Sequence, residues 1–326
     1  MFIFLPINII YYIIIIFFSF SCLITRSWIE VWIFLELINI SFIPIILINQ
    51  KFKISSVNVF KIYVIFTITS YIILLILTIN KYKYFFLFIL ILFLVKLNLR
   101  PFYIWYILII KDLDYKRLLT FLTLFKFPVF ICLILLLNMN NNFILKFIFS
   151  LSLFIPTIHR LKEIKLKNFL FLSSRYHSTW ICIILSKNIF KEWVWYFIAY
   201  RLIIVIALTV INEINILTFR DIIIIKNNHL FTLINLTFLN ILGIPPTGGF
   251  IVKIIVIYQL YLIYFIDLII VFMVTTSVFW VYNYFTISIK YWTINNISFF
   301  YNSELLNTNM KYLLIRLFIL PFLIFS

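Results

Sequence analysis

Glycine and acidic residues are both scarce in this sequence of 326 residues. The three glycines are Gly243, Gly248 and Gly249, so neither a G-x-G-x-x-G fingerprint nor a phosphate-binding P-loop can form. Ten Asp and Glu residues stand against 27 Lys and Arg residues, which gives a net charge of +17. Alanine is also rare, whereas Ile, Phe, Leu, Asn, Lys and Tyr are abundant, as in proteins from AT-rich organelle genomes. Nucleotide binding through the usual glycine-rich motifs is therefore excluded.

Cysteine occurs at three isolated positions, Cys22, Cys132 and Cys182, each within an apolar segment. No C-x-x-C spacing or histidine cluster accompanies them, which indicates buried thiols and predicts no disulfide, metal or iron–sulfur site. The N-terminus lacks both an Arg/Ser-rich presequence and a small-residue cleavage site. We therefore expect the first apolar segment to be retained as a membrane span.

Apolar residues dominate the chain. It is 65% hydrophobic and 11% charged, with a mean hydropathy of +1.18, far from the composition of soluble domains. Because a spanning helix needs about 20 apolar residues, the pattern predicts an all-α, polytopic membrane bundle of about 11 helices. The expected spans are 3–23, 28–48, 59–79, 84–110, 118–137, 143–158, 169–185, 193–211, 230–262, 268–289 and 312–325.

Two of these spans, 84–110 and 230–262, are long and interrupted by proline. They lie five helices apart, which suggests two five-helix repeats, at about 1–138 and 142–290, followed by a final helix at about 311–326. Because five is an odd number, the second repeat would be inverted in the membrane, as in transporters whose site lies near the bilayer midplane. The alternative is that two prolines fall in matching places by coincidence.

Residues 242–253, L-G-I-P-P-T-G-G-F-I-V-K, contain every glycine and two of the eight prolines. Proline cannot continue an ordinary helix, and a helix break at membrane depth is tolerated inside protein or beside a water-filled cavity. Lys253 follows directly, and an ionisable residue inside a membrane is a candidate for function. The alternative is a loop between two short helices with Lys253 extending to the lipid headgroups.

Three further ionisable residues lie inside predicted spans: Glu36, Lys96 and Lys126. A lysine in apolar surroundings releases its proton more readily, whereas a carboxylate at about 4 Å retains it with about 4 kcal/mol at an effective dielectric near 20. Moving the carboxylate away and back would therefore unload and reload the lysine. Alternatively, Lys96 and Lys126 pair with helix-end carbonyls freed by Pro101 and Pro128.

His177 lies among hydroxyl residues in the span 169–185 and could relay protons, since its unperturbed pKa is near 6.5. A satisfied interior histidine is the alternative. We expect Arg100, Arg175 and Arg201 to lie close enough to segment ends to reach the headgroups, and we assign them no role.

Lysine and arginine are concentrated in alternate loops. The positive-inside rule places that side of the membrane, together with the N-terminus, in the matrix or cytoplasm. With eleven spans, the C-terminus would face the opposite side.

Five segments follow one another along the chain: W-I-F-L-E-L at 32–37, K-L-N-L-R-P-F-Y-I-W at 96–105, T-L-F-K-F-P-V at 123–129, S-S-R-Y-H-S-T-W at 173–180 and L-G-I-P-P-T-G-G-F-I-V-K at 242–253. In this order they resemble the mitochondrially encoded subunit 2 family of NADH dehydrogenase, an antiporter-like membrane subunit of respiratory complex I, in its truncated eleven-helix form. The family's corresponding motifs are W-x-G-L-E-x, K-L-G-L-x-P-F-H-F-W, T-W-Q-K-x-x-P, S-S-I-x-H-x-G-W and G-G-L-P-P-x-x-G-F-x-x-K.

This sequence departs from the family at several positions. Phe34, Asn98, Thr179 and Leu242 stand where the family usually has glycine, and Arg100 replaces a small residue. Pro128 lies one residue before the family's proline, and the usual L-P-E is missing from 106–111.

The resemblance implies a proton-translocating subunit of NADH:ubiquinone oxidoreductase in the mitochondrial inner membrane. Glu36 and Lys96 would form a coupled pair, Lys126 would be the central relay, and Lys253 would face the next antiporter-like subunit. This chain would bind no cofactor itself: NADH, FMN, iron–sulfur clusters and ubiquinone would bind to other subunits. Its partners would be the neighbouring membrane-arm subunits and lipids, with no nucleic acid.

Two other classes of protein fit the same sequence pattern. A free-standing cation/proton antiporter would use the same broken helices and lysines, but it would bind a solute and work without partners. A structural membrane scaffold would have no use for buried charges.

Overall fold

The computed structural model describes residues 4–25, 27–47, 54–79, 84–99, 110, 113–137, 143–160, 165–214, 218–219, 221, 228–245, 247–264 and 268–295. These residues are almost entirely helical; they contain one isolated bridge between Lys165 and Thr218 and no strand. The predicted all-α fold is therefore confirmed. The final helix expected at 311–326, and residues 100–109 of the fourth span, lie outside the described residues.

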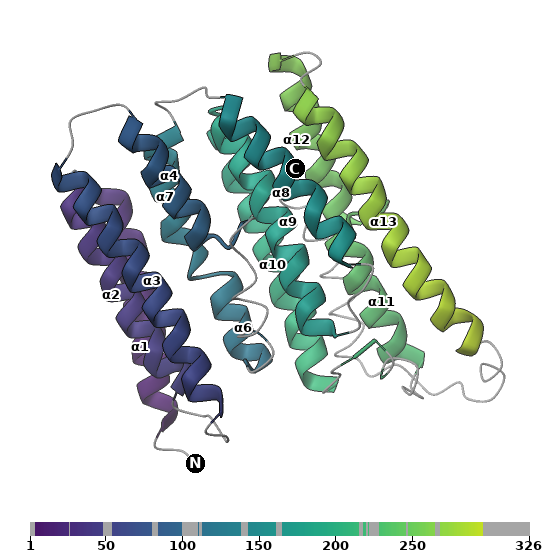
Figure 1. Cartoon of the computed structure of the whole chain (residues 1–326). Helices are drawn as coiled ribbons and strands as arrows, with labels where there is room; N and C mark the ends of the chain where they lie inside the picture. Colours follow the sequence, from purple (N-terminus) through teal and green to yellow (C-terminus); the bar gives the residue numbers. More distant parts are fainter. Residues whose placement is uncertain are drawn as a thin grey trace. The chain divides into compact units, whose positions relative to one another are not determined.

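The chain divides into two compact units, Met1–Phe143 and Ile144–Ser326. The helices of unit 1 contact one another in a closed sequence, α1 with α2, α2 with α3, α3 with α4, α4 with α7, and α7 with α1 (Figure 1). Their bounds are α1 Phe4–Ile24, α2 Trp28–Leu47, α3 Ile54–Ile79, α4 Tyr84–Lys96, α6 Tyr115–Leu122 and α7 Lys126–Leu137.

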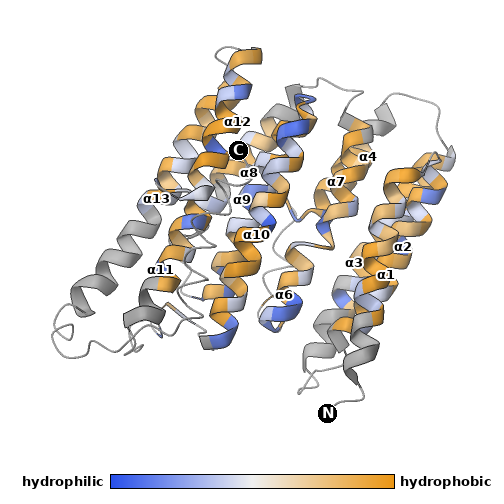
Figure 2. Ribbon diagram, turned by 180° about the vertical axis from the view of Figure 1, so that it is seen from behind, coloured by the Kyte–Doolittle hydropathy of each residue, from blue (hydrophilic) through white to orange (hydrophobic). Residues whose placement is uncertain are grey.

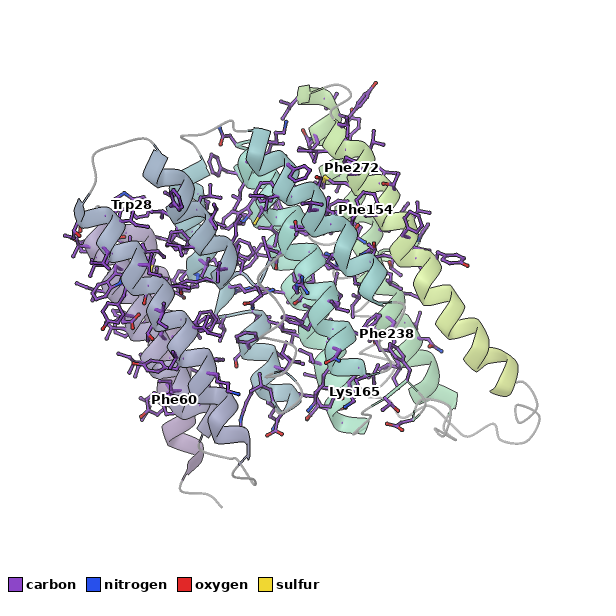
Figure 3. The ribbon with its side chains drawn as sticks, viewed as in Figure 1. Trp28, Phe60, Phe154, Lys165, Phe238 and Phe272 are labelled. Carbon is purple, nitrogen blue, oxygen red and sulfur yellow. The ribbon has the colours of Figure 1, made fainter. Side chains whose placement is uncertain are left out.

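Helix α10 is central to the contacts of unit 2, because α9, α11 and α12 all pack against it, while α13 packs on α11 and α12. Rings fill the spaces between these helices, as where Phe154 of α8 meets Phe272 of α13 edge to face at 5.2 Å (Figure 3). The bounds are α8 Phe143–Arg160, α9 Leu166–Ser186, α10 Phe190–Ile214, α11 Asn228–Leu242, α12 Gly248–Tyr264 and α13 Leu268–Asn295.

The described helices are mainly hydrophobic along their length (Figure 2). Three spans within them are long and apolar enough to cross a membrane, Trp28–Ile45, Tyr115–Ile134 and Phe190–Glu213, and five shorter apolar helices accompany these. Hydrocarbon offers no partner for backbone N–H and C=O groups, so segments of this composition satisfy them internally as helices. The chain is a multi-pass membrane protein, as predicted.

Helices α4 and α11 end in the same way. Asn98 and Gly243 both adopt the left-handed conformation, with φ of 61° and 69°. In each case the next amide bonds back to a carbonyl five residues earlier, from Leu99 to Leu94 and from Ile244 to Leu239. This is the Schellman ending, which usually carries glycine at the left-handed position. Asn98 therefore preserves the backbone geometry at a site where the family resemblance leads one to expect glycine.

The span expected at 118–137 is not one continuous helix, and the prediction was wrong on this point. Helix α6 ends at Leu122, a turn covers 123–125, and α7 begins at Lys126. Pro128 explains the interruption, because its nitrogen carries no hydrogen to donate to the carbonyl of Leu124. A proline in the first turn of α7 loses nothing, since amides there have no partner within the helix.

Substitution of Asn98 tests whether the left-handed ending of α4 constrains the protein. Alanine at this position should lower the free energy of unfolding by about 1 kcal/mol, because asparagine adopts the left-handed conformation more readily than alanine does. Glycine should be tolerated, because Asn98 Oδ1 makes no hydrogen bond among the described residues. The measurement is thermal unfolding of the purified protein in detergent.

Asn188, which ends α9 with a φ of 59°, provides a matched control. Asn188→Ala should cost about as much as Asn98→Ala. Equal stability of Asn98→Ala and the unaltered protein would show that the left-handed ending of α4 does not require asparagine or glycine at residue 98.

Candidate functional site

The five residues singled out from the sequence lie inside the protein, divided between the two units. Lys96 and Lys126 of unit 1 are 2% and 3% exposed, while Lys253 and His177 of unit 2 are 5% and 6% exposed. Glu36 is half-buried. Burial of these cations is costly unless the surroundings compensate, so the contacts of each one matter.

Glu36 of α2 is held by side chains from its own helix and from α3. The hydroxyl of Ser70 donates to Glu36 Oε2 at 2.6 Å, and the amide of Asn39 donates to the same oxygen at 3.0 Å. Trp32 Nε1 donates to the backbone carbonyl of Ser70 at 2.9 Å, which fixes α3 against α2 at this level. Ser70 is fully buried. Neutral donors therefore orient the Glu36 side chain, and no ion pair to it occurs among the described residues.

Lys96 is the last residue of α4, where the negative end of the helix dipole favours a cation. Its Nζ makes no hydrogen bond among the described residues. An electrostatic interaction links it to Glu36 and to Cys132 of α7. The structure thus brings Lys96 and Glu36 into one electrostatic group within unit 1, as the sequence suggested, but gives Lys96 no fixed hydrogen-bond acceptor there.

Lys126 is the first residue of α7, at the positive end of the helix dipole, which disfavours its charge. The turn before it is enclosed by rings: Phe125 lies 4.9 Å from Phe42 of α2 and 4.6 Å from Phe66 of α3, measured between ring centroids. Phe121 of α6 stacks on Phe42 as well. A dry aromatic cluster therefore adjoins the break that presents Lys126.

The consecutive prolines between α11 and α12 free two backbone acceptors. In a continuous helix the carbonyls of Ile241 and Leu242 would accept from the amides of residues 245 and 246, but both of these are proline and have no N–H. His177 Nε2 lies 3.1 Å from the carbonyl oxygen of Ile241, and Lys253 Nζ donates to that of Leu242 at 2.5 Å. Two neighbouring carbonyls thus hold the imidazole of His177 and the ammonium of Lys253.

The ammonium of Lys253 is further stabilised by aromatic rings of α9. Its Nζ lies 5.4 Å from the ring centroid of Tyr176 and 5.9 Å from that of Trp180. Cations at this distance from ring faces are attracted by the aromatic quadrupole. The alternative that Lys253 extends to the headgroups is therefore wrong: the side chain turns inward and caps α11.

Asn240 completes the junction in the opposite direction. Its side-chain oxygen accepts the backbone N–H of Gly249 at 2.8 Å and so caps the start of α12. A Cβ on Gly249 would lie 2.0 Å from the carbonyl oxygen of Asn240, so glycine is required for this approach. Each half of the broken helix therefore supplies a hydrogen-bond partner for the free backbone groups of the other. Asn240 of α11 caps α12, and Lys253 of α12 caps α11.

His177 connects three helices. Its Nδ1 lies 2.7 Å from the hydroxyl of Tyr196 on α10, and its Nε2 contacts α11 through Ile241. The ring of Tyr200 stacks on the imidazole with centroids 4.3 Å apart. His177 is thus an interior histidine with a contact at both ring nitrogens. The carbonyl it contacts, that of Ile241, precedes the carbonyl of Leu242 that binds Lys253.

Two arginines do not lie where the sequence analysis placed them. Arg175 is near the middle of α9 and 1% exposed, with its guanidinium 5.4 Å from the ring centroid of Phe171. Arg201 is near the middle of α10, 4.0 Å from the ring centroid of Phe197. Neither is at a helix end, so the expectation that they reach the headgroups is wrong. Arg100 lies outside the described residues.

Four residues of the site, Ser70, Asn39, Tyr196 and Asn240, were hardly recognisable from the sequence. Each is an ordinary polar residue within an apolar helix, and its partner is distant along the chain or set by helix rotation. Asn240 had a weak signal, because it lies five residues before Pro245, where a helix that ends before the proline pair would have its last turn. For Tyr196 the aromatic content of the whole chain conceals any signal.

Buried lysines at helix breaks, a carboxylate in electrostatic contact with one of them and a membrane-spanning helical fold define an ion-translocating class of membrane protein. The chain belongs to the NADH:quinone oxidoreductase/Mrp antiporter transmembrane family, whose model matches residues 77–280. The family resemblance inferred from the sequence is confirmed.

Two relatives are named NADH-ubiquinone oxidoreductase chain 2. The protein from Artemia franciscana is 26% identical over 280 residues, which cover 84% of this chain and 87% of that protein. The protein from Anopheles gambiae is 26% identical over 268 residues, covering 78% and 76%.

Solved structures share the fold at lower identity. A chain of respiratory complex I from Thermus thermophilus with bound aureothin matches with a TM-score of 0.72 and 16% identity, over 91% of this chain and 72% of that one. A chain of the Mrp complex from Dietzia sp. DQ12-45-1b matches with a TM-score of 0.73 and 11% identity, over 84% and 58%.

Ser70→Ala tests whether the contacts of Glu36 matter for function. A hydrogen bond to a charged group contributes about 1.5–3 kcal/mol, so its loss should slow proton translocation by about tenfold if Glu36 carries protons. The measurement is proton uptake by vesicles that contain the assembled protein. Thr69→Ala is the matched control, because the neighbouring hydroxyl of Thr69 bonds to Phe66 of its own helix. Equal rates for both variants would contradict a role for the Ser70 contact.

Proposed function

We propose that this chain is a proton-translocating membrane subunit of an NADH:ubiquinone oxidoreductase, located in the mitochondrial inner membrane. Its neighbours would be other membrane-arm subunits, including antiporter-like ones. NADH, FMN, iron–sulfur clusters and ubiquinone would bind to other subunits of the assembly, and quinone reduction there would drive the charges in this chain. The family of the chain and its relatives named NADH-ubiquinone oxidoreductase chain 2 support this assignment.

The observation that carries the proposal is the proline-broken junction of unit 2. A buried lysine and a buried histidine lie on adjacent backbone carbonyls that the proline pair has freed. A helix break of this kind is costly in a membrane, and a purely structural protein would gain nothing from two titratable groups at the break. A role in proton translocation would explain why both titratable groups lie at the break.

The roles of the individual residues are those that the family resemblance implies. In unit 1, Glu36 and Lys96 would act as the coupled pair, since a change in their separation alters how firmly Lys96 holds a proton. Lys126 would be the central relay. In unit 2, His177 would take part in proton transfer, and Lys253 would be the amine on the side of the next antiporter-like subunit.

The inverted five-helix repeat remains part of the proposal. The identical left-handed endings of α4 and α11 support it, because both precede a proline in the sequence and both lie beside a buried lysine. Equivalent breaks in two halves are characteristic of transporters with a site near the midplane.

The orientation is a proposal as well: the N-terminus faces the matrix and the C-terminus the intermembrane space. Lys165 and Lys187 flank the two ends of α9. A membrane-impermeant thiol reagent should therefore label Lys165→Cys from the matrix side and Lys187→Cys from the other side. The reverse pattern would overturn this topology.

A free-standing cation/proton antiporter is the second candidate, because the family of the chain includes Mrp antiporters as well as NADH:quinone oxidoreductases. Such a protein would move protons in exchange for a cation without quinone chemistry. The two candidates differ in the assembly that each requires.

A native gel of membranes extracted in mild detergent separates these candidates. The gel is probed for this chain and stained for NADH dehydrogenase activity. Co-migration with a very large NADH-oxidising band supports the proposed subunit. Migration as a monomer or dimer without that activity contradicts it and favours the antiporter.

Within that assembly, Lys96→Met should leave the band on the gel in place but slow coupled proton pumping by about tenfold or more, as expected for loss of a proton-transfer group. Proton uptake per NADH oxidised by reconstituted vesicles is the measurement. Lys61→Met is the matched control, since Lys61 is exposed on α3. Undiminished pumping by the assembled Lys96→Met variant would remove Lys96 from the pathway.

A further inference from the structure

The two nitrogens of His177 have chemically different partners. Nε2 lies 3.1 Å from the backbone carbonyl oxygen of Ile241, and Nδ1 lies 2.7 Å from the hydroxyl oxygen of Tyr196. A carbonyl oxygen can only accept a hydrogen bond, whereas a phenol can donate or accept. The two sides of the ring therefore have different capacities to exchange a proton.

The contact with Ile241 fixes the hydrogen on Nε2. Because residue 245 is proline, no amide of the same helix turn competes for this carbonyl. The contact is favourable when Nε2 carries a hydrogen, which holds for the neutral ring in one tautomer and for the imidazolium. In both protonation states the Nε2–H bond stays in place.

Rotation of the ring cannot exchange the two nitrogens, because aromatic side chains enclose it. Tyr200 stacks on the imidazole with an interplanar angle of 25°, and Trp180 stacks on the ring of Tyr196 with an angle of 9°. Both tyrosines and Trp180 are buried. The imidazole is thus held in one orientation, with Nδ1 toward Tyr196.

We propose that Tyr196 is the group through which His177 gains and loses its proton. When the ring is neutral, the Tyr196 hydroxyl donates to Nδ1; when the ring is charged, Nδ1–H donates to the phenol oxygen. On charging, the Tyr196 O–H bond breaks as the Nδ1–H bond forms, and a hydronium ion reprotonates the phenol oxygen and becomes a neutral water molecule. No buried phenolate is left behind, which would be costly.

This inference rests on the proposed function. It adds the side of the imidazole from which the proton arrives, which the sequence around His177 does not reveal. Among the ring contacts of the described residues, the titratable groups beside the imidazole are the phenols of Tyr176, Tyr196 and Tyr200. The ammonium of Lys253 lies on the adjacent carbonyl, that of Leu242. Because Nε2–H keeps its hydrogen, protons do not pass straight through the ring toward α11. His177 instead acts as a store that is filled and emptied from α10.

The test compares Tyr196→Phe with Tyr258→Phe in the assembled complex. Tyr196→Phe keeps the ring but removes the hydroxyl at Nδ1, and it should slow proton pumping by about tenfold or more. Tyr258→Phe removes an exposed phenol hydroxyl of α12 and should pump at close to the unaltered rate. Proton uptake is followed across pH, because loss of a proton donor changes the pH profile, whereas a packing defect lowers the rate at every pH.

A double variant separates relay from packing. If Tyr196 acts through His177, then Tyr196→Phe combined with His177→Gln should pump at the rate of His177→Gln alone. Further slowing by the product of the two single effects would overturn the proposal, as would normal pumping by Tyr196→Phe.

Infrared difference spectra between the unaltered complex and His177→Gln give a readout that does not depend on assembly of the Tyr196 variant. The neutral imidazole should show the Nε2–H tautomer, and the Nδ1–H tautomer would contradict the proposal. The native gel of unaltered membranes is run first. Absence of this chain from the NADH-oxidising band would contradict the proposed function itself, whereas its presence together with normal pumping by Tyr196→Phe would contradict the Tyr196 relay alone.

Discussion

Every interrupted helix in a membrane exposes backbone groups that hydrocarbon cannot satisfy, and the functional half of unit 2 is arranged around that constraint. Pro245 and Pro246 deny the carbonyls of Ile241 and Leu242 their usual amide partners. The oxygens are satisfied instead by His177 and Lys253, two side chains that can carry protons. The interruption that would destabilise an ordinary span thus provides hydrogen-bond acceptors for His177 and Lys253.

Unit 1 meets the same constraint with different residues. The end of α4 is closed by Asn98 in the left-handed conformation, and Lys96 lies at the helix terminus under the influence of Glu36. Glu36 in turn is held by Ser70 and Asn39. Neutral donors thus orient the Glu36 side chain, and the electrostatic interaction between Glu36 and Lys96 depends on the distance between their charged atoms.

Much of the fold could be predicted from composition and periodicity, because apolar runs of membrane length have one stable backbone solution, the helix. The break at 243–247 was also predictable, since proline and glycine act locally. The break before Lys126 entered only as an alternative, through helix-end carbonyls freed by Pro128, because a proline in a first turn and a proline inside a helix look alike in sequence. Arg175 was expected near the membrane surface but is buried near the middle of α9. The limits of an apolar segment in the sequence do not show how deeply each of its residues is buried.

The sequence by itself determined the membrane-spanning class of the protein, its family and the buried ionisable residues, because those depend on residue type, order and spacing along the chain. The tertiary structure alone decided which partner each residue has. Tyr196 meets His177 across 19 positions, Ser70 meets Glu36 across 34 and Ile241 meets His177 across 64. Such pairs depend on the rotation and depth of each helix against its neighbours, and spans that are apolar on all sides carry no periodic signal for either.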